Sequence, residues 1–185
     1  MIFTHDLHAV VGDILRSLAI DGSEILLDKA CGGTESIRLY GELDDSRQRD
    51  PCLCWVDAAI LFNGSLQVIV EIEQSDIRPL YFCGKLLATA LSRYYKGKRG
   101  RFALSDSLLF IQIFERKDDN ENWSKYNQCR YLMQEFNRCL LHPRTRIKEY
   151  VFHYGTVEDF GVAEHREALA NEVAQYLTKS LAEKA

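Results

Sequence analysis

An Asn-Gly pair at positions 63 and 64 constrains the fold of this chain more than any other short segment, because it stands between two runs rich in apolar residues. Asn and Gly both tolerate the positive φ of a type I′ turn, so the pair predicts a β-hairpin with strands at 53–62 and 66–73. Val68, Ile69 and Val70 follow one another in the second strand. Such a run is typical of a strand that is buried on both faces at the centre of a sheet.

The segments around the hairpin alternate between helical and strand patterns. The apolar residues of segment 7–18 fall on one helical face, with Thr4 as candidate N-cap and Asp21-Gly22 as its end. Pro79 opens a second helix that we expect to reach about residue 95. Further predicted elements are strands at 24–28, 108–114 and 147–154, helices at 123–141 and 162–181, and turns or loops at 31–38, 41–51, 96–101 and 115–121. We therefore expect one α/β domain over residues 1–185, a mixed β-sheet flanked by α-helices.

Composition excludes several classes of protein. With 46% hydrophobic and 27% charged residues, the 185-residue chain has ordinary globular composition, which argues against disorder. The net charge of −4 argues against a protein that coats nucleic acid by bulk charge alone. Charged residues interrupt the first 19 positions, so we expect no signal peptide, no membrane association and a cytoplasmic location.

Six cysteines are present, and without a signal peptide they favour free thiols over disulfides. They are Cys31, Cys52, Cys54, Cys83, Cys129 and Cys139. Cys52 and Cys54 alternate in a strand-like segment, and no second pair stands at zinc-finger spacing. We interpret both as small buried hydrophobic residues rather than zinc ligands.

Three acidic residues carry the main indication of chemistry. Asp57 lies six residues before the predicted turn, Glu71 lies seven after it, and Glu73 shares a strand face with Glu71. The three carboxylates are therefore expected to converge. They would repel one another unless a cation neutralises them, and hard oxygen ligands suit Mg²⁺ or Mn²⁺. The alternative is a solvated strand face, but acids at the end of a buried strand need a reason.

This arrangement resembles the PD-(D/E)xK superfamily, the restriction endonuclease-like nucleases. The family places an Asp on one hairpin strand and Glu-x-Lys on the next, here Val56-Asp57 and Glu71-Ile72-Glu73. The resemblance covers residues 7–114, including the helix and strand after the hairpin. It implies a restriction endonuclease-like fold and a hydrolase that cuts phosphodiester bonds, with DNA as the expected substrate, Mg²⁺ or Mn²⁺ as cofactor and a homodimer as a possible state.

The resemblance also implies roles for individual residues. Asp57 and Glu71 would be the metal ligands, with the main-chain carbonyl of Ile72 as a further one. Glu73 replaces the lysine of the motif, and it would act as base or as a second metal ligand. Lys85 could instead reach in from the next helix, with Arg78 as a less favoured substitute. Gln74 could bind phosphate or metal-bound water, and Asp13 could complete the site from the first helix.

Two basic clusters are candidate contacts for nucleic acid. The first is interleaved with glycines and with Tyr94 and Tyr95, which could stack on unpaired bases; its members are Arg93, Lys96, Lys98, Arg99 and Arg101. The second comprises Arg144, Arg146 and Lys148. Each could equally be a solvated loop. His5 and His8 share a helix face, and we interpret them as surface residues rather than metal ligands.

Three functions remain open at this level. The first is a divalent-metal-dependent deoxyribonuclease that uses Asp57, Glu71, Glu73 and Lys85. The second is a non-catalytic nucleic-acid- or partner-binding protein of the same fold. The third is an unrelated α/β protein in which the acids hold a structural ion. Whether Glu73 in place of the lysine of the motif preserves activity is decided only by experiment.

Overall fold

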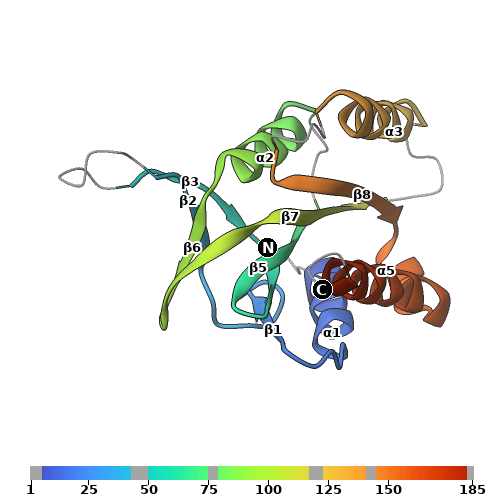
Figure 1. Ribbon diagram of the computed structural model, residues 1–185. Coiled ribbons are helices and arrows are strands. Elements are labelled where there is room, and N and C mark those ends of the chain that lie inside the picture. The colour runs from blue at the N-terminus through green and yellow to red at the C-terminus, as the bar shows by residue number, and fades with distance from the viewer. Residues whose placement is uncertain (1–5, 43–49, 75–78, 117–122, 141–144, 183–185) are drawn as a thin grey trace.

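The computed structural model describes residues 6–42, 50–74, 79–116, 123–140 and 145–182 (Figure 1). In chain order its elements are α1 (Asp6–Arg16), β1 (Ser23–Leu27), β2 (Ile37–Tyr40), β3 (Cys52–Val56), β4 (Ala58–Phe62), β5 (Ser65–Glu73), α2 (Pro79–Leu91), β6 (Tyr94–Gly97), β7 (Gly100–Glu115), α3 (Trp123–Glu135), the π-helical turn η1 (Phe136–Leu140), β8 (Ile147–Gly155), α4 (Val157–Gly161) and α5 (Ala163–Ala182).

The predicted hairpin is present and forms the centre of a mixed sheet. Strands β4 and β5 pair antiparallel, and the turn between them has positive φ at Asn63 (50°) and Gly64 (80°), as a type I′ turn requires. On its other side β5 pairs in parallel with β7, and β7 pairs in parallel with β8. All the residues from Leu66 to Ile72 are buried, which confirms the prediction of a central strand.

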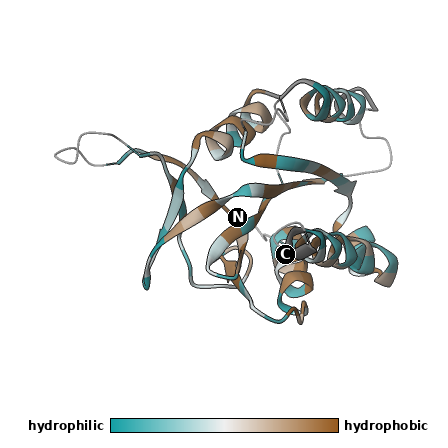
Figure 2. Cartoon of the chain, viewed as in Figure 1, coloured by the Kyte–Doolittle hydropathy of each residue, from teal (hydrophilic) through white to brown (hydrophobic). Residues whose placement is uncertain are grey.

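Helices cover both faces of this sheet (Figure 1). Helices α2 and α3 lie on one face, and α1 and α5 lie on the other. Each face has its own apolar core: Val68 and Val70 of β5 pack with α1 and α5, whereas Ile69 packs with Phe82 of α2. Hydrophobic residues colour long stretches of the central strands and of α2 (Figure 2). The chain is therefore α/β with a mixed sheet between helices, as expected. None of the described helices is long and apolar enough to cross a membrane.

The first strand of the hairpin differs from the prediction. Segment 53–62 is two strands, β3 and β4, with a bend at Asp57 between them. Both the main chain and the side chain of Asp57 accept hydrogen bonds there. Its carbonyl accepts the N–H of Asp28 at 2.9 Å, and its carboxylate accepts the N–H of Ile72 at 2.7 Å. These two bonds turn the chain from β4 into a second sheet region, in the order β7, β6, β2, β3.

The segment after α2 also differs. The helix ends at Leu91 rather than near residue 95, and the hydroxyl of Ser92 donates to the carbonyl of Ala88 in its last turn. The expected loop at 96–101 is a β-hairpin of β6 and the first part of β7. Tyr94 and Tyr95, expected to be helical, lie in β6 and are buried, since their rings pack against Tyr40 and Phe102.

Several smaller predictions need correction. Segment 31–38, expected to be a turn, contains the start of β2, and α4 was not expected. The short helix α4 is capped by Thr156, whose side chain and that of Asp159 bond each other's main-chain N–H groups. The described cysteines have free thiols, although Cys52 is exposed rather than buried. The expectations for Thr4 and His5, and for most of the loops at 41–51 and 115–121, lie outside the described residues.

Candidate functional site

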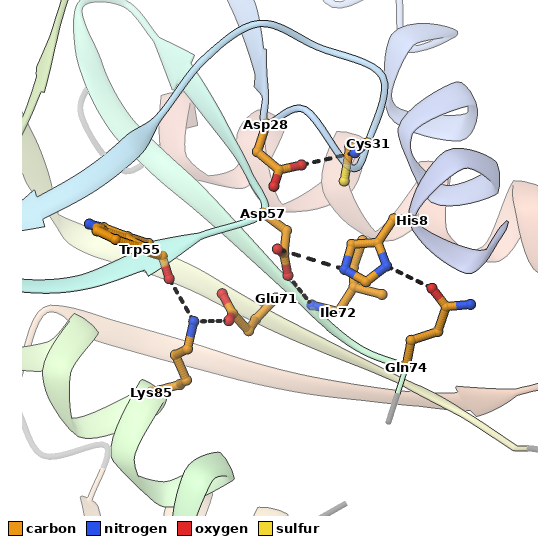
Figure 3. A network of polar contacts seen from close by, with 9 residues as sticks. All are labelled: His8, Asp28, Cys31, Trp55, Asp57, Glu71, Ile72, Gln74 and Lys85. Atoms are coloured by element: carbon orange, nitrogen blue, oxygen red, sulfur yellow. Dashed lines mark hydrogen bonds and ion pairs between the residues drawn. The ribbon is translucent and has the colours of Figure 1, made fainter. Parts of the chain in front are cut away.

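Asp57 and Glu71 meet where β4 and β5 leave the hairpin (Figure 3). Glu71 lies near the end of β5 and is 2% exposed, whereas Asp57 is half-buried at the bend before β4. The main-chain N–H of Ile72 holds Asp57 by donating to Oδ2 at 2.7 Å. The hairpin register, with Ala58 opposite Val70, explains why residues so distant in sequence are neighbours. The sequence therefore predicted correctly that these two acids are neighbours, and the structure adds the N–H of Ile72 as a donor to Asp57.

Lys85 reaches the same place from α2. Its ammonium group forms an ion pair with Oε1 of Glu71 and donates to the main-chain carbonyl of Trp55 at 2.7 Å. Figure 3 shows the side chain directed from the helix toward the strands. The sequence raised this placement as one of two options for the missing lysine of the motif. Arg78, the other substitute, lies outside the described residues.

On the opposite side of Asp57 lie His8 of α1 and Gln74, the residue that follows β5. Nε2 of His8 lies 3.7 Å from Oδ1 of Asp57, and its Nδ1 is hydrogen-bonded to Oε1 of Gln74 at 2.9 Å (Figure 3). His8 is 7% exposed, so its interpretation as a surface residue was wrong. The buried face of α1 is wider than the apolar stripe predicted, because it also includes His8 and Gly12. Gln74 here positions His8, a role that the sequence did not indicate.

The acids line an open pocket of about 650 Å³. Its wall combines the carboxylates with the ammonium group of Lys85 and with apolar and aromatic side chains. The lining residues are Leu53, Cys54, Trp55, Asp57, Glu71, Ile72, Glu73, Leu80, Tyr81, Gly84, Lys85 and Ala88. Glu73 is half-buried, on the same strand face as Glu71. All three predicted acids and Lys85 therefore share one pocket.

Burial dominates the electrostatics of these carboxylates. Loss of water raises the pKa of Asp57, Glu71 and Glu73 above their usual values, and the nearby charge of Asp57 raises that of Glu71 further. Lys85 acts in the opposite direction on all three acids. Burial alone would lower the pKa of Lys85, but the carboxylate of Glu71 outweighs it, so its pKa is raised. Added positive charge would therefore favour the ionised acids.

Two buried polar atoms beside the pocket have no hydrogen-bond partner among the described residues: Oε2 of Glu71 and Nε2 of Gln112. The two residues are register partners on the parallel strands β5 and β7, so they share a face of the sheet. The other amide atom of Gln112 accepts the hydroxyl of Tyr150 at 3.0 Å. Buried polar groups normally have a hydrogen-bond partner. Oε2 of Glu71 is therefore an acceptor that could bind a donor or a cation.

These residues fit a Mg²⁺ or Mn²⁺ ion only as a partial ligand set. No group of three His, Cys, Asp or Glu side chains in the described parts of the chain is arranged to hold a metal. Mg²⁺, however, usually takes one or two protein carboxylates and completes its shell with water and phosphate. Asp57 and the unsatisfied oxygen of Glu71 meet that smaller requirement. Asp13 does not join them, because it is exposed and forms an ion pair with Arg16.

The first basic cluster is a hairpin whose cations are largely paired. Lys98, Arg99 and Arg101 form ion pairs with acidic side chains of other elements, Glu35, Glu24 and Glu42 respectively. Arg93 and Lys96 are exposed. The expectation that Tyr94 and Tyr95 stack on bases was wrong, since both are buried. In the second cluster Arg146 pairs with Asp106, and Arg144 lies outside the described residues.

Comparisons of the chain with protein-family models, with characterised proteins and with solved structures found no match. The sequence also missed three parts of the site: His8, Asp28 and the carbonyl of Trp55. Asp28 raises the pKa of Asp57 by its charge. Its place follows from the pairing of β1 with β4, which puts Leu27 opposite Ala58. The sequence predicted both strands but not that they pair, so it could not place Asp28 beside Asp57.

Proposed function

We propose that this chain is a divalent-metal-dependent nuclease of the restriction endonuclease-like type, acting on phosphodiester bonds and most readily on those of DNA. The observation that carries the proposal is the buried carboxylate of Glu71, which has one oxygen on Lys85 and the other, next to Asp57, without a hydrogen-bond partner among the described residues. A carboxylate pair with an adjacent ammonium group suits the negative charge of a phosphate once a cation is bound.

The arrangement of the elements agrees with the same class. A helix precedes the hairpin, a second helix follows it, and that helix leads to a strand parallel to β5. Glu71 and Glu73 lie on β5, Asp57 lies at the bend just before β4, and Lys85 comes from the helix that follows the hairpin. This is the order that the PD-(D/E)xK resemblance predicts, and it supports the proposal through topology rather than through a matched sequence.

Each residue has a defined task in the proposed reaction. Asp57 and Glu71 would hold Mg²⁺ or Mn²⁺, with the N–H of Ile72 fixing the orientation of Asp57. The bound ion would supply a water of lowered pKa and a charge that stabilises the phosphate oxygens. Glu73, on the same strand face, is in position to accept a proton from water. Lys85, held by Glu71 and the carbonyl of Trp55, would donate to a phosphate oxygen.

A second function, a non-catalytic nucleic-acid-binding protein of the same fold, is favoured by one observation. The ammonium group of Lys85 already pairs with Glu71, so one buried carboxylate is compensated by a residue of the chain itself. Glu73 also stands where the motif has lysine. A protein of this kind would bind nucleic acid without a divalent cation and would leave its phosphodiester bonds intact.

Cleavage assays separate the two functions. The native chain, Asp57→Ala and Glu71→Ala are incubated with plasmid and with single-stranded DNA in Mg²⁺, in Mn²⁺ and in chelator. The nuclease proposal predicts metal-dependent cutting that both substitutions abolish, while Asp13→Ala, a matched change of an exposed acid, cuts like the native chain. DNA binding without cutting would favour the second function, and neither binding nor cutting would refute both.

A further inference from the structure

Exposed aromatic groups border the carboxylate pocket. Trp55 and Tyr81 are both among the residues that line it, and their side chains are 62% and 59% exposed. Exposed apolar surface rimmed by polar groups is typical of a binding site. The ring of Trp55 offers a flat apolar face at the border of the pocket. A base of an unpaired nucleotide is a planar group that such faces recognise.

Positive charge extends from Trp55 across the neighbouring strands. The guanidinium group of Arg38 lies over the Trp55 ring, 5.4 Å from its centroid, and the two residues are register partners on β2 and β3. The next strand is β6, where Tyr95 pairs with Leu39. Continuing that antiparallel register by one residue brings Lys96 beside Arg38. All three residues are exposed, so they form a row across one face of the sheet, which we call the Trp55 row.

The opposite face of these strands belongs to the core. Leu39 and Tyr95 are almost fully buried and pack in the apolar cluster under α2. The alternation of β2 and β6 therefore puts Arg38 and Lys96 on the outer face by necessity. Successive strands lie about 4.8 Å apart, so the row spans roughly 10 Å from Trp55 to Lys96. That length suits two neighbouring phosphates of an extended single strand.

We propose that the pocket takes single-stranded nucleic acid, with an unpaired base stacked on Trp55 and the adjoining phosphates on Arg38 and Lys96. The proposal rests on the proposed nuclease function for its reacting site, because the same pocket holds Asp57 and Glu71. It adds the substrate class: a duplex keeps its bases stacked on one another, so its bases cannot cover the Trp55 ring. Only a strand with unpaired bases can use the ring and the acids together.

Binding measurements in Ca²⁺, which supports phosphate contacts without requiring turnover, test the inference apart from catalysis. The probes are fluorescein-labelled twelve-nucleotide oligo(dT), oligo(U) and a blunt duplex of equal length. The native chain should bind a single strand more tightly than the duplex. Trp55→Ala should weaken binding of the single strand about 5- to 100-fold, and Trp55→Phe should restore most of it. Tyr131→Ala removes a ring of matched exposure, 60%, from α3 outside the pocket and should change nothing.

The salt dependence tests the cationic part of the row. Replacing both Arg38 and Lys96 by alanine should reduce the slope of log K against log [salt] by about 1.4, because each contact with a single strand contributes about 0.7. Lys179→Ala, which removes an exposed cation from α5, should leave the slope unchanged. Tighter binding of either oligo(dT) or oligo(U) is consistent with the inference, and the preference identifies the sugar.

Three results would overturn it. The first is equal affinity for duplex and single strand, and the second is a Trp55→Ala variant that binds like the native chain. Either result would overturn the inference even if the native chain cuts DNA, and the nuclease proposal would then remain without it. The third is Trp55-dependent binding of an apolar dye without binding of any oligonucleotide, which would indicate a protein partner instead. Conversely, Trp55-dependent binding of a single strand without cleavage would keep the inference and refute only the nuclease.

Discussion

The ammonium group of Lys85 forms an ion pair with the buried carboxylate of Glu71 (Figure 3). Glu71 is 3% exposed at its side chain and Lys85 is 32% exposed. The carboxylate of Glu71 is therefore shielded from water, whereas the ammonium group of Lys85 is partly hydrated. Removing the lysine leaves a buried carboxylate without compensation, which is among the costlier single changes in a protein.

Lys85→Met should accordingly destabilise the fold in a pH-dependent way. Burial raises the pKa of Glu71 in the folded chain above its unfolded value, so the folded state holds an extra proton between the two values. Stability then falls as pH rises through the folded pKa. Without Lys85 that pKa rises further, so we expect a loss of about 2 to 3 kcal/mol at pH 8 and a smaller loss at pH 5.5.

Urea unfolding of the native chain and the variant in chelator, at both pH values, measures this difference. Lys179→Met serves as the control, because it makes the same exchange at an exposed position of α5. A loss of stability that is equal at pH 5.5 and pH 8 would show that Lys85 acts through packing of its aliphatic chain rather than through the charge of Glu71.

Two glycines within helices should respond oppositely to alanine. A Cβ on Gly12 of α1 would lie 2.2 Å from the carbonyl oxygen of Cys31, so Gly12→Ala must push the helix from the loop that precedes β2. We expect a loss of about 2 to 3 kcal/mol. A Cβ on Gly84 of α2 meets nothing within 4 Å, and Gly84→Ala should stabilise the chain by about 1 kcal/mol.

Thermal unfolding of the two glycine variants checks both directions in one experiment. Because each change adds the same methyl group to a helix, helix propensity raises the stability of both and the difference between them reports the contact at Cys31. A Gly12→Ala variant as stable as Gly84→Ala would mean that α1 does not approach this loop so closely.

The cap of α4 should stabilise the fold at neutral pH and lose that contribution in acid. The main-chain N–H of Thr156 donates to Asp159 at 2.8 Å and lowers the pKa of that carboxyl, to which Arg116 also adds. A lowered folded pKa means that the stabilisation is complete above the unfolded value, about 3.8, and is lost as pH falls through the folded one. Asp159→Asn should cost about 1 kcal/mol at pH 7.

This cost should shrink as the pH is lowered from 4 toward 2, where the native carboxyl becomes protonated as well. Chemical unfolding at pH 7, 4 and 2.5 follows it, with Glu158→Gln, the adjacent acid of the same first turn, as control. A constant difference between the native chain and Asp159→Asn over this range would contradict an ionised cap.

The central hairpin and the acids could be read from the sequence because their signals are local. Asn63-Gly64 fixes the turn, the turn fixes the register, and the register brings Asp57 beside Glu71. The uninterrupted apolar run of β5 likewise predicted that this strand lies at the centre of the sheet. Lys85 was within reach of the same reasoning, since the next helix begins only six residues after Glu73.

The remainder depended on contacts between distant segments. His8 is buried because α1 packs its wider face on the sheet, and Tyr94 and Tyr95 leave the helix because β2 offers them a partner strand. The break at Asp57 depends on Asp28, 29 residues earlier in the chain. None of these partners is marked by spacing or composition near the residue that it determines.

Direct titration with Mn²⁺ is the best test of the divalent-cation site that we propose at Asp57 and Glu71. Electron paramagnetic resonance reports the free ion, so binding is measured without substrate or turnover. We expect the native chain to bind one Mn²⁺ per chain, Asp57→Asn and Glu71→Gln each to weaken binding at least about tenfold, and Asp13→Asn to bind like the native chain. Mn²⁺ affinity unchanged in both Asp57→Asn and Glu71→Gln would contradict it.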